Sequence, residues 1–127
     1  MSEDTKKLIM VVDDEEMLRD LFCSYLSSSG FDTYPCENGA DAVDKFKLLN
    51  GKVDMVLLDI EMPMMRGPEC FEKMKEINPA VKVIILSGYA SDNCIPKMLK
   101  NGALGHIMKP TGMCFLLNYI KEHLAKD

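Results

Sequence analysis

Several features are scarce in this chain of 127 residues, and each shortage excludes a class of protein. No apolar run exceeds five residues, whereas a membrane-spanning helix needs about 20, so we expect no membrane span. Basic residues never cluster beyond the pair Lys6-Lys7, and 20 acidic residues outnumber 15 basic ones, which argues against direct binding of nucleic acid. The first seven residues are too polar for a signal peptide, so we expect a cytoplasmic protein.

Cysteine is present, but its spacing excludes the structures that cysteine usually builds. The five cysteines are odd in number, far apart and without a C-x-x-C pair, so neither a disulfide framework nor a zinc site is indicated. With 47% hydrophobic and 28% charged residues, the chain has the composition of a folded protein. Its length fits one domain over residues 1–127 with an ordered core at about 7–124, and leaves no room for an output domain.

Short apolar runs alternate with stretches of helical periodicity along the whole chain. The runs predict strands at 8–12, 31–36, 53–59, 81–87 and 105–108, and a helical stripe follows each of them. Such alternation is typical of an α/β fold, a doubly wound, five-stranded parallel sheet with helices on both faces. Pro35 cannot donate a ladder hydrogen bond, which predicts that its segment lies at an edge or at a strand end.

Polar residues stand at the carboxyl ends of four predicted strands, where ligands bind in sheets of this kind. They are Asp13-Asp14, Asp59, Ser87 and Lys109. Clustered carboxylates repel an anion and need a cation, and hard oxygen ligands favour Mg²⁺ or Mn²⁺. A carboxylate can also attack phosphorus, with a metal and an ammonium neutralising the charge. The residues therefore predict phosphoryl chemistry, with Asp59 as the nucleophile and Lys109 and the metal as clamps.

Each of these residues also has a plainer interpretation. Asp13-Asp14 could cap a helix N-terminus, where acidic residues are favourable without any metal. Asp59 could cap the turn that follows it, and Lys109 could be a solvated surface charge. Taken together, these interpretations must treat it as coincidence that such residues stand at the ends of four predicted strands.

Four segments of the chain resemble the signature segments of one family, the receiver domains of two-component response regulators. The segments are Val11-Val12-Asp13-Asp14-Glu15, Leu57-Leu58-Asp59-Ile60-Glu61-Met62-Pro63, Ile85-Leu86-Ser87-Gly88 and Met108-Lys109-Pro110. Their order and spacing match, and the resemblance covers the chain from Lys7 to Leu124. It implies a flavodoxin-like strand order, 2-1-3-4-5.

The resemblance also implies roles for the acidic residues. Asp59 would accept phosphate from a histidine kinase or a histidine phosphotransfer protein. Asp14, Asp59 and the backbone carbonyl of Glu61 would ligate Mg²⁺, and Asp13 would reach the ion through water. Phosphorylation would change the face built by the fourth helix, the fifth strand and the last helix, which a downstream protein target reads.

The remaining implied roles concern the phosphoryl group and the switch. Ser87 would hydrogen-bond one phosphoryl oxygen, Lys109 would pair with another, and the peptide bond before Pro110 would be cis. The position of the family's switch aromatic falls on His106, an ionisable residue. Two further departures are Met64-Met65-Arg66-Gly67, where the family usually has an Asp before the Gly, and Thr111-Gly112, which predicts a late start of the last helix.

Two rival functions stay open on sequence alone. One is a phosphatase of the haloacid-dehalogenase type, which needs a second Asp two residues after the nucleophile and a downstream acidic pair. Glu61 fits poorly there, and no acidic residue occurs between Asp92 and Glu122. The other is an interaction module that works without phosphorylation, against which the complete set of site residues argues. We therefore expect no enzyme beyond catalysis of the protein's own phosphorylation and dephosphorylation.

Overall fold

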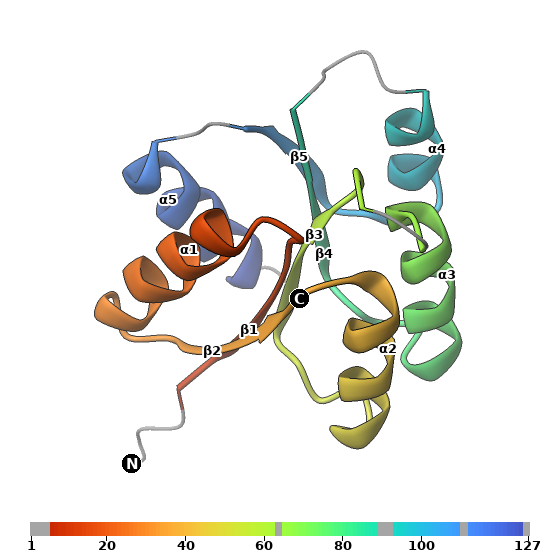
Figure 1. The fold of residues 1–127 in the computed structure, drawn as a ribbon, viewed down its shortest axis with the longest axis horizontal. Coiled ribbons are helices and arrows are strands. Elements are labelled where there is room, and N and C mark those ends of the chain that lie inside the picture. Colours follow the sequence, from red (N-terminus) through yellow and green to blue (C-terminus); the bar gives the residue numbers. More distant parts are fainter. Residues whose placement is uncertain (1–5, 63–64, 89–92, 110–111, 126–127) are drawn as a thin grey trace.

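The structure, a computed structural model, describes residues 6–62, 65–88, 93–109 and 112–125. Strands and helices alternate strictly along these residues (Figure 1). The strands are β1 (Leu8–Val12), β2 (Asp32–Cys36), β3 (Met55–Asp59), β4 (Val83–Ser87) and β5 (Gly105–Met108). The helices are α1 (Glu16–Ser28), α2 (Gly39–Leu48), α3 (Gly67–Ile77), α4 (Cys94–Lys100) and α5 (Met113–Leu124).

The five strands form one parallel sheet in the order β2-β1-β3-β4-β5. This confirms the doubly wound α/β fold and the expected strand order. Strand β2 lies at one edge, where Pro35 pairs in register with Val11. An edge strand has one side without a ladder partner, and this is why a residue without an N–H is tolerated there.

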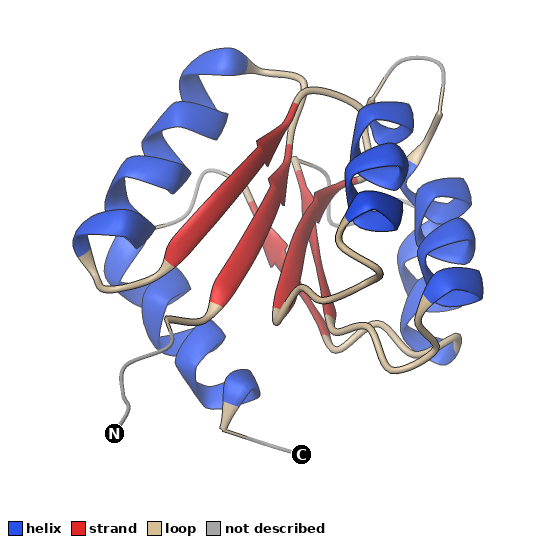
Figure 2. Ribbon diagram, turned by 90° about the horizontal axis from the view of Figure 1, so that it is seen from below, coloured by secondary structure: helices blue, strands red, loops and turns tan. Residues whose placement is uncertain are grey.

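Helices cover both faces of the sheet, with α1 and α5 on one face and α2, α3 and α4 on the other (Figures 1 and 2). Strand residues alternate between the two layers, as the pleat requires. In β1, Ile9 and Val11 pack in the α1–α5 layer, and Met10 and Val12 pack in the opposite one. All four side chains are fully buried, and burial of each stabilises the fold by about 1.5 to 3 kcal/mol. Among the described residues, no helix is both long and apolar enough to cross a membrane.

Three strands begin one or two residues later than the sequence predicts, since residues 31, 53 and 81 precede β2, β3 and β4. The cause lies in their backbone hydrogen bonds. The N–H of Val53 donates to the carbonyl of Gly51 at 2.9 Å, and the N–H of Val81 donates to the carbonyl of Asn78 at 3.0 Å. Both residues are apolar and buried, but their N–H groups close turns and do not join the sheet ladder.

The carboxyl ends of β1, β3, β4 and β5 meet along one edge of the sheet, because all the strands run in the same direction. The loop after β3 is held there by a close approach. A Cβ atom at Gly67, the first residue of α3, would overlap the backbone and side chain of Ile60. Glycine therefore allows α3 to start directly against the end of β3.

Candidate functional site

The residues predicted to carry chemistry are brought together at this edge. In the described part of the chain, the polar or charged side chains that are buried are Asp13, Asp59 and Ser87. Each stands at or directly after the end of a strand, and Lys109 follows β5 in the same way. Burial of a carboxylate is costly unless it is paired, so the partners of these side chains define the site.

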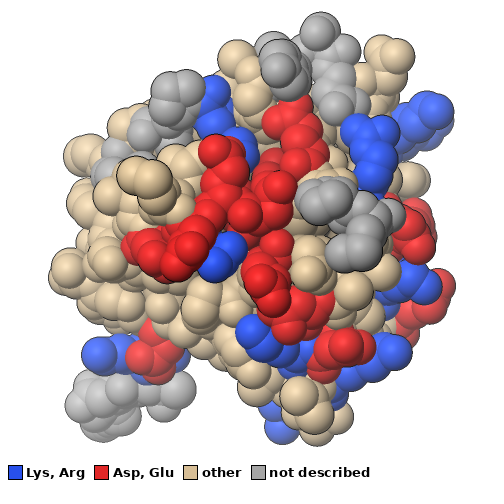
Figure 3. All heavy atoms as spheres, in the orientation of Figure 1, with Lys and Arg blue, Asp and Glu red and all other residues tan. Residues whose placement is uncertain are grey.

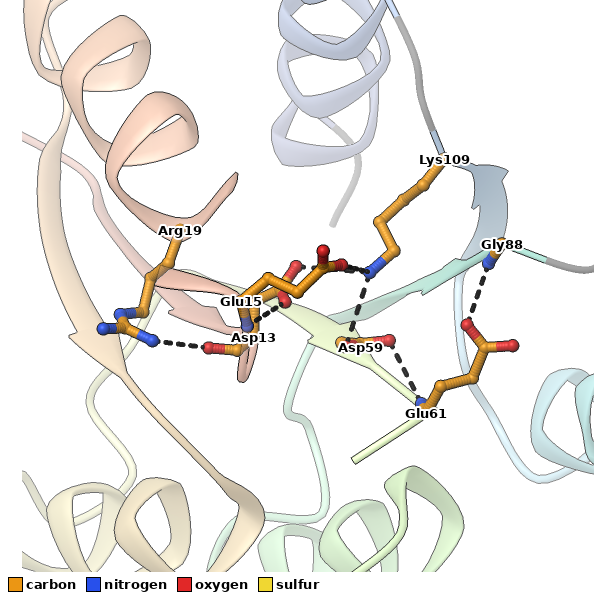
Figure 4. A network of polar contacts seen from close by, with 7 residues as sticks. All are labelled: Asp13, Glu15, Arg19, Asp59, Glu61, Gly88 and Lys109. Carbon is orange, nitrogen blue, oxygen red and sulfur yellow. Dashed lines mark hydrogen bonds and ion pairs between the residues drawn. The ribbon is translucent and has the colours of Figure 1, made fainter. Parts of the chain in front are cut away.

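Lys109 is the cation around which the site is arranged (Figure 4). Its Nζ lies 3.4 Å from Asp13 Oδ2, 3.4 Å from Asp59 Oδ2 and 3.6 Å from Glu15 Oε1. Only 9% of the Lys109 side chain is exposed, so water screens its pairs with the buried Asp13 and Asp59 weakly. One ammonium therefore faces three carboxylates, and the site keeps an excess of negative charge.

The loop after β1 fixes the orientation of Asp13. Asp13 Oδ1 accepts a hydrogen bond from the N–H of Glu15 at 2.9 Å, and Arg19 Nη1 donates to the carbonyl of Asp13 at 2.8 Å. The residue that precedes α1 is Glu15, whose side chain makes no capping hydrogen bond. Glu15, and neither Asp13 nor Asp14, is therefore the residue at the N-terminal boundary of the helix. Asp13 instead turns its second oxygen toward Lys109.

Burial and neighbouring charges shift the pKa values of the central pair. Burial raises the pKa of Asp59 to about 7, although the hydrogen bond from the N–H of Glu61 and the charge of Lys109 act in the opposite direction. Burial by itself would lower the pKa of Lys109, but the carboxylates of Asp59 and Asp13 outweigh it and raise that pKa above its ordinary value. Lys109 therefore stays an ammonium, whereas keeping the buried Asp59 ionised costs free energy.

Three carboxylates in the described residues lie close enough together to hold a cation between them. One oxygen each from Asp13, Asp14 and Asp59 can be chosen so that all three lie within 4.8 Å of one another. Asp13 and Asp59 are buried and Asp14 is exposed, so the group is open to solvent on one side. Figure 3 shows acidic side chains gathered across the middle of this face. Hard oxygen donors in this number fit Mg²⁺, which keeps several waters when it binds protein.

Two glutamates contact the site in ways that the sequence did not predict. Glu61 donates its N–H to Asp59 Oδ1 at 3.1 Å, and its Oε1 accepts a hydrogen bond from the N–H of Gly88 at 3.1 Å. Glu15 reaches Lys109, as described above. The resemblance implies a role only for the backbone carbonyl of Glu61. Sequence spacing places both glutamates near the site, but it does not say where a long flexible side chain points.

The two residues predicted to act as the switch, Ser87 and His106, lie on β4 and β5. Ser87 ends β4, and its carbonyl accepts a hydrogen bond from the N–H of Lys109 at 2.7 Å. His106 pairs in register with Ile85, two residues before Ser87, so the three side chains share one face of the sheet. His106 is partly buried, and its Nε2 has no hydrogen-bond partner among the described residues. The predicted cis bond before Pro110 lies outside the described residues.

Comparison with known proteins identifies relatives over nearly the whole chain. Residues 9–121 match the family described as response regulator receiver domain. The sporulation initiation phosphotransferase F of Bacillus subtilis is 32% identical over 91% of this chain and 92% of its own length. The sensor kinase CckA of Brucella abortus is 30% identical over 94% of this chain, which spans only 13% of that kinase.

Solved structures agree with these relatives. A CheY-like receiver domain from Methanospirillum hungatei has a TM-score of 0.87 and 31% identity, and the match covers 95% of each chain. A complex of CheX with CheY, BeF3 and Mg²⁺ from Borrelia burgdorferi has a TM-score of 0.88 and 27% identity. The match covers 94% of this chain and 90% of that one.

Proposed function

The chain belongs to the family of response regulator receiver domains, and we propose that it is a phosphoacceptor switch of a two-component phosphorelay with Asp59 as the acceptor. One observation supports this choice of residue above all. Asp59 is a buried carboxylate whose Oδ2 lies 3.4 Å from the ammonium of Lys109, at the open edge of the sheet. A buried nucleophile with a fixed cation beside it suits phosphoryl transfer, because charge moves onto oxygen as the reaction proceeds.

The transfer step needs only a phosphohistidine donor. An oxygen of Asp59 forms a bond to phosphorus while the P–N bond of the donor breaks, and the bonding electrons stay on the ring nitrogen. Lys109 pairs with one phosphoryl oxygen, and the hydroxyl of Ser87 donates a hydrogen bond to another. Because both groups are positioned by strand ends before the donor arrives, little reorganisation is needed. The product is an acyl phosphate on Asp59.

The carboxylates of Asp13, Asp14 and Asp59 suit Mg²⁺ as a cofactor, and Mn²⁺ prefers the same oxygen ligands. Asp14, Asp59 and the carbonyl of Glu61 would hold the ion, and Asp13 would reach it through water. The ion supplies positive charge to the phosphoryl oxygens when bound. Asp13 and Asp59 are already held in place by Lys109, so these two carboxylates are in position before an ion binds.

The partners follow from this chemistry. The donor is a histidine kinase or a histidine phosphotransfer protein, and the recipient of the signal is a downstream protein target, all in the cytoplasm. We place the output on the face of α4, β5 and α5. Large apolar side chains stand exposed on each of these elements, namely Leu99 (40%), Met108 (46%) and Phe115 (58%). Each element of this face therefore offers one exposed apolar side chain that a protein partner could cover.

Phosphorylation by a small donor tests the proposal. Incubation with acetyl phosphate and Mg²⁺ is expected to add one phosphate to the wild-type protein and none to Asp59→Asn, as measured by intact mass. A variant that still gains one phosphate refutes the assignment of Asp59. Sustained release of phosphate from an ester substrate would instead revive the phosphatase, and a wild-type protein that gains nothing would favour an interaction module without phosphorylation.

A further inference from the structure

Two donor groups at the edge of the sheet where Asp59 lies, the ammonium of Lys109 and the N–H of Gly88, already contact carboxylates from outside the acidic triad. The ammonium of Lys109 lies 3.6 Å from Glu15 Oε1, and the N–H of Gly88 donates to Glu61 Oε1 at 3.1 Å. Glu15 stands in the loop after β1, and Glu61 stands in the loop after β3. Figure 4 shows the two side chains reaching the site from opposite sides of Asp59.

Neither glutamate is needed to hold the buried charges in place. Lys109 is paired with Asp13 and Asp59 without Glu15, and the side chain of Glu15 is 62% exposed. An ion pair that exposed contributes little to stability, so Glu15 can leave for water at small cost. Glu61 is partly exposed, and its backbone N–H holds Asp59 whether or not its side chain stays on Gly88.

The donors that these glutamates occupy are suited to a phosphoryl group. Lys109 is the ammonium that the proposed transfer uses. Gly88 directly follows Ser87 at the end of β4, and its N–H already binds an anionic oxygen of Glu61, whose backbone N–H donates to Asp59. A phosphate on an oxygen of Asp59 carries about two negative charges and strong acceptor oxygens, as other phosphorylated side chains do. The glutamates and the phosphate therefore compete for the same partners.

We propose that Glu15 and Glu61 are resident anions that occupy the phosphoryl-binding donors in the unphosphorylated protein and must be displaced when Asp59 is phosphorylated. This inference rests on the proposed function of Asp59. On this view the two glutamates do not touch the phosphoryl group, but they control how readily the site accepts it. Their charge opposes the approach of the anionic donor, and their carboxylates delay its access to Lys109 and Gly88.

Rates of phosphorylation by phosphoramidate with saturating Mg²⁺ test the inference. In this reaction an oxygen of Asp59 bonds to phosphorus, the P–N bond breaks, and the nitrogen leaves with the bonding electrons as ammonia. We expect Glu15→Gln and Glu61→Gln each to accelerate the reaction about three- to tenfold, the effect of removing one like charge at a distance of several ångströms. Glu61→Ala should accelerate it at least as much as Glu61→Gln.

The glutamine variant separates charge from structure, because its amide oxygen still accepts a hydrogen bond from Gly88. If Glu61 only ties two loops together, Glu61→Gln will match the wild type. The matched controls are Glu16→Gln and Glu69→Gln, which remove the same charge from exposed positions in the first turns of α1 and α3. Beryllofluoride, a phosphoryl mimic, should also bind the Glu15 and Glu61 variants about three- to tenfold more tightly than it binds the controls.

The amide resonance of Gly88 gives a direct readout by nuclear magnetic resonance. It should shift when Glu61→Ala removes the carboxylate, and shift again when beryllofluoride binds. Glutamate variants that react no faster than the two controls overturn the inference, even where Asp59 is the acceptor. A wild-type protein that gains no phosphate, or an Asp59→Asn variant that gains one, overturns the proposed function and this inference with it.

Discussion

Removing the exposed acid of the triad should stabilise the protein when no metal is present. Asp14 is exposed, and one of its oxygens can lie within 4.8 Å of oxygens of both Asp13 and Asp59. Two unit charges at that distance repel by about 1 kcal/mol in water and by about 3 kcal/mol near a protein surface. Lys109 lies among the same carboxylates and offsets part of this repulsion. We therefore expect Asp14→Asn to raise the free energy of unfolding by about 1 kcal/mol.

The assay is thermal unfolding in excess chelator and then in excess Mg²⁺. For a domain of this size, about 1 kcal/mol corresponds to a rise of about 4 °C in Tm. Mg²⁺ should raise the Tm of the wild type, because an ion that binds only the folded state stabilises it. Asp14→Asn lacks one proposed ligand, so Mg²⁺ should raise its Tm less than it raises that of the wild type. The variant should therefore have the higher Tm in chelator and the lower Tm in Mg²⁺.

A control variant separates this local effect from the loss of one acidic charge. Asp44→Asn removes a carboxylate from an exposed position of α2, away from the acidic triad. It should change the Tm by no more than a degree or two in either solution, because lone surface charges contribute little. If Asp14→Asn is less stable than the wild type in chelator, Asp14 has a structural role and the repulsion argument is refuted.

Three further predictions concern single residues of the site. The pKa of Asp59 is raised to about 7 from an ordinary 3.8, so between these two pH values the folded state binds a proton that the unfolded state has lost. Without metal, the free energy of unfolding should therefore fall by about 2 to 4 kcal/mol as the pH rises from 4 to 7. Asp59→Asn should remove this fall, and urea titrations in which variant and wild type show equal slopes of the free energy of unfolding against pH would contradict the prediction. His106→Phe should raise the free energy of unfolding by about 1 kcal/mol, since the buried Nε2 of His106 has no hydrogen-bond partner among the described residues. If the variant is less stable than the wild type in the same titration, Nε2 has a hydrogen-bond partner in solution. Arg19→Met should lose the hydrogen bond to the carbonyl of Asp13, lower the free energy of unfolding by about 1 kcal/mol and weaken Mg²⁺ binding in calorimetry; unchanged affinity would mean that Arg19 does not position the loop.

The sequence predicted those parts of the structure that depend on periodicity and direction. The apolar run at β1 alternates between two layers because a strand does so. Asp13, Asp59 and Lys109 meet because parallel strands end at one edge, although 96 positions separate Asp13 from Lys109. Neither result requires knowledge of a side-chain conformation.

What the sequence did not predict depends on individual side chains and on local hydrogen bonds. Glu61 has several rotatable bonds, and nothing in its spacing indicates that its carboxylate reaches Gly88. Val53 is apolar and follows a turn, so its pattern is that of a strand, yet its N–H bonds to Gly51 and it precedes β3. Such choices are decided by competing contacts of similar energy, which a periodic pattern does not encode.

The contact between Lys109 and Asp13 has a consequence for how the chain matures. It joins residues 96 positions apart, and Lys109 directly follows β5, the last of the described strands, which lies beside β4 at the edge of the sheet. During synthesis the three aspartates leave the ribosome well before the lysine that pairs with two of them. A nascent chain that ends before β5 therefore carries Asp59 without the ammonium that pairs with it. On the proposed function, in which Asp59 reacts beside this ammonium, the ability to take up a phosphoryl group arrives only when β5 and the residue after it have been made.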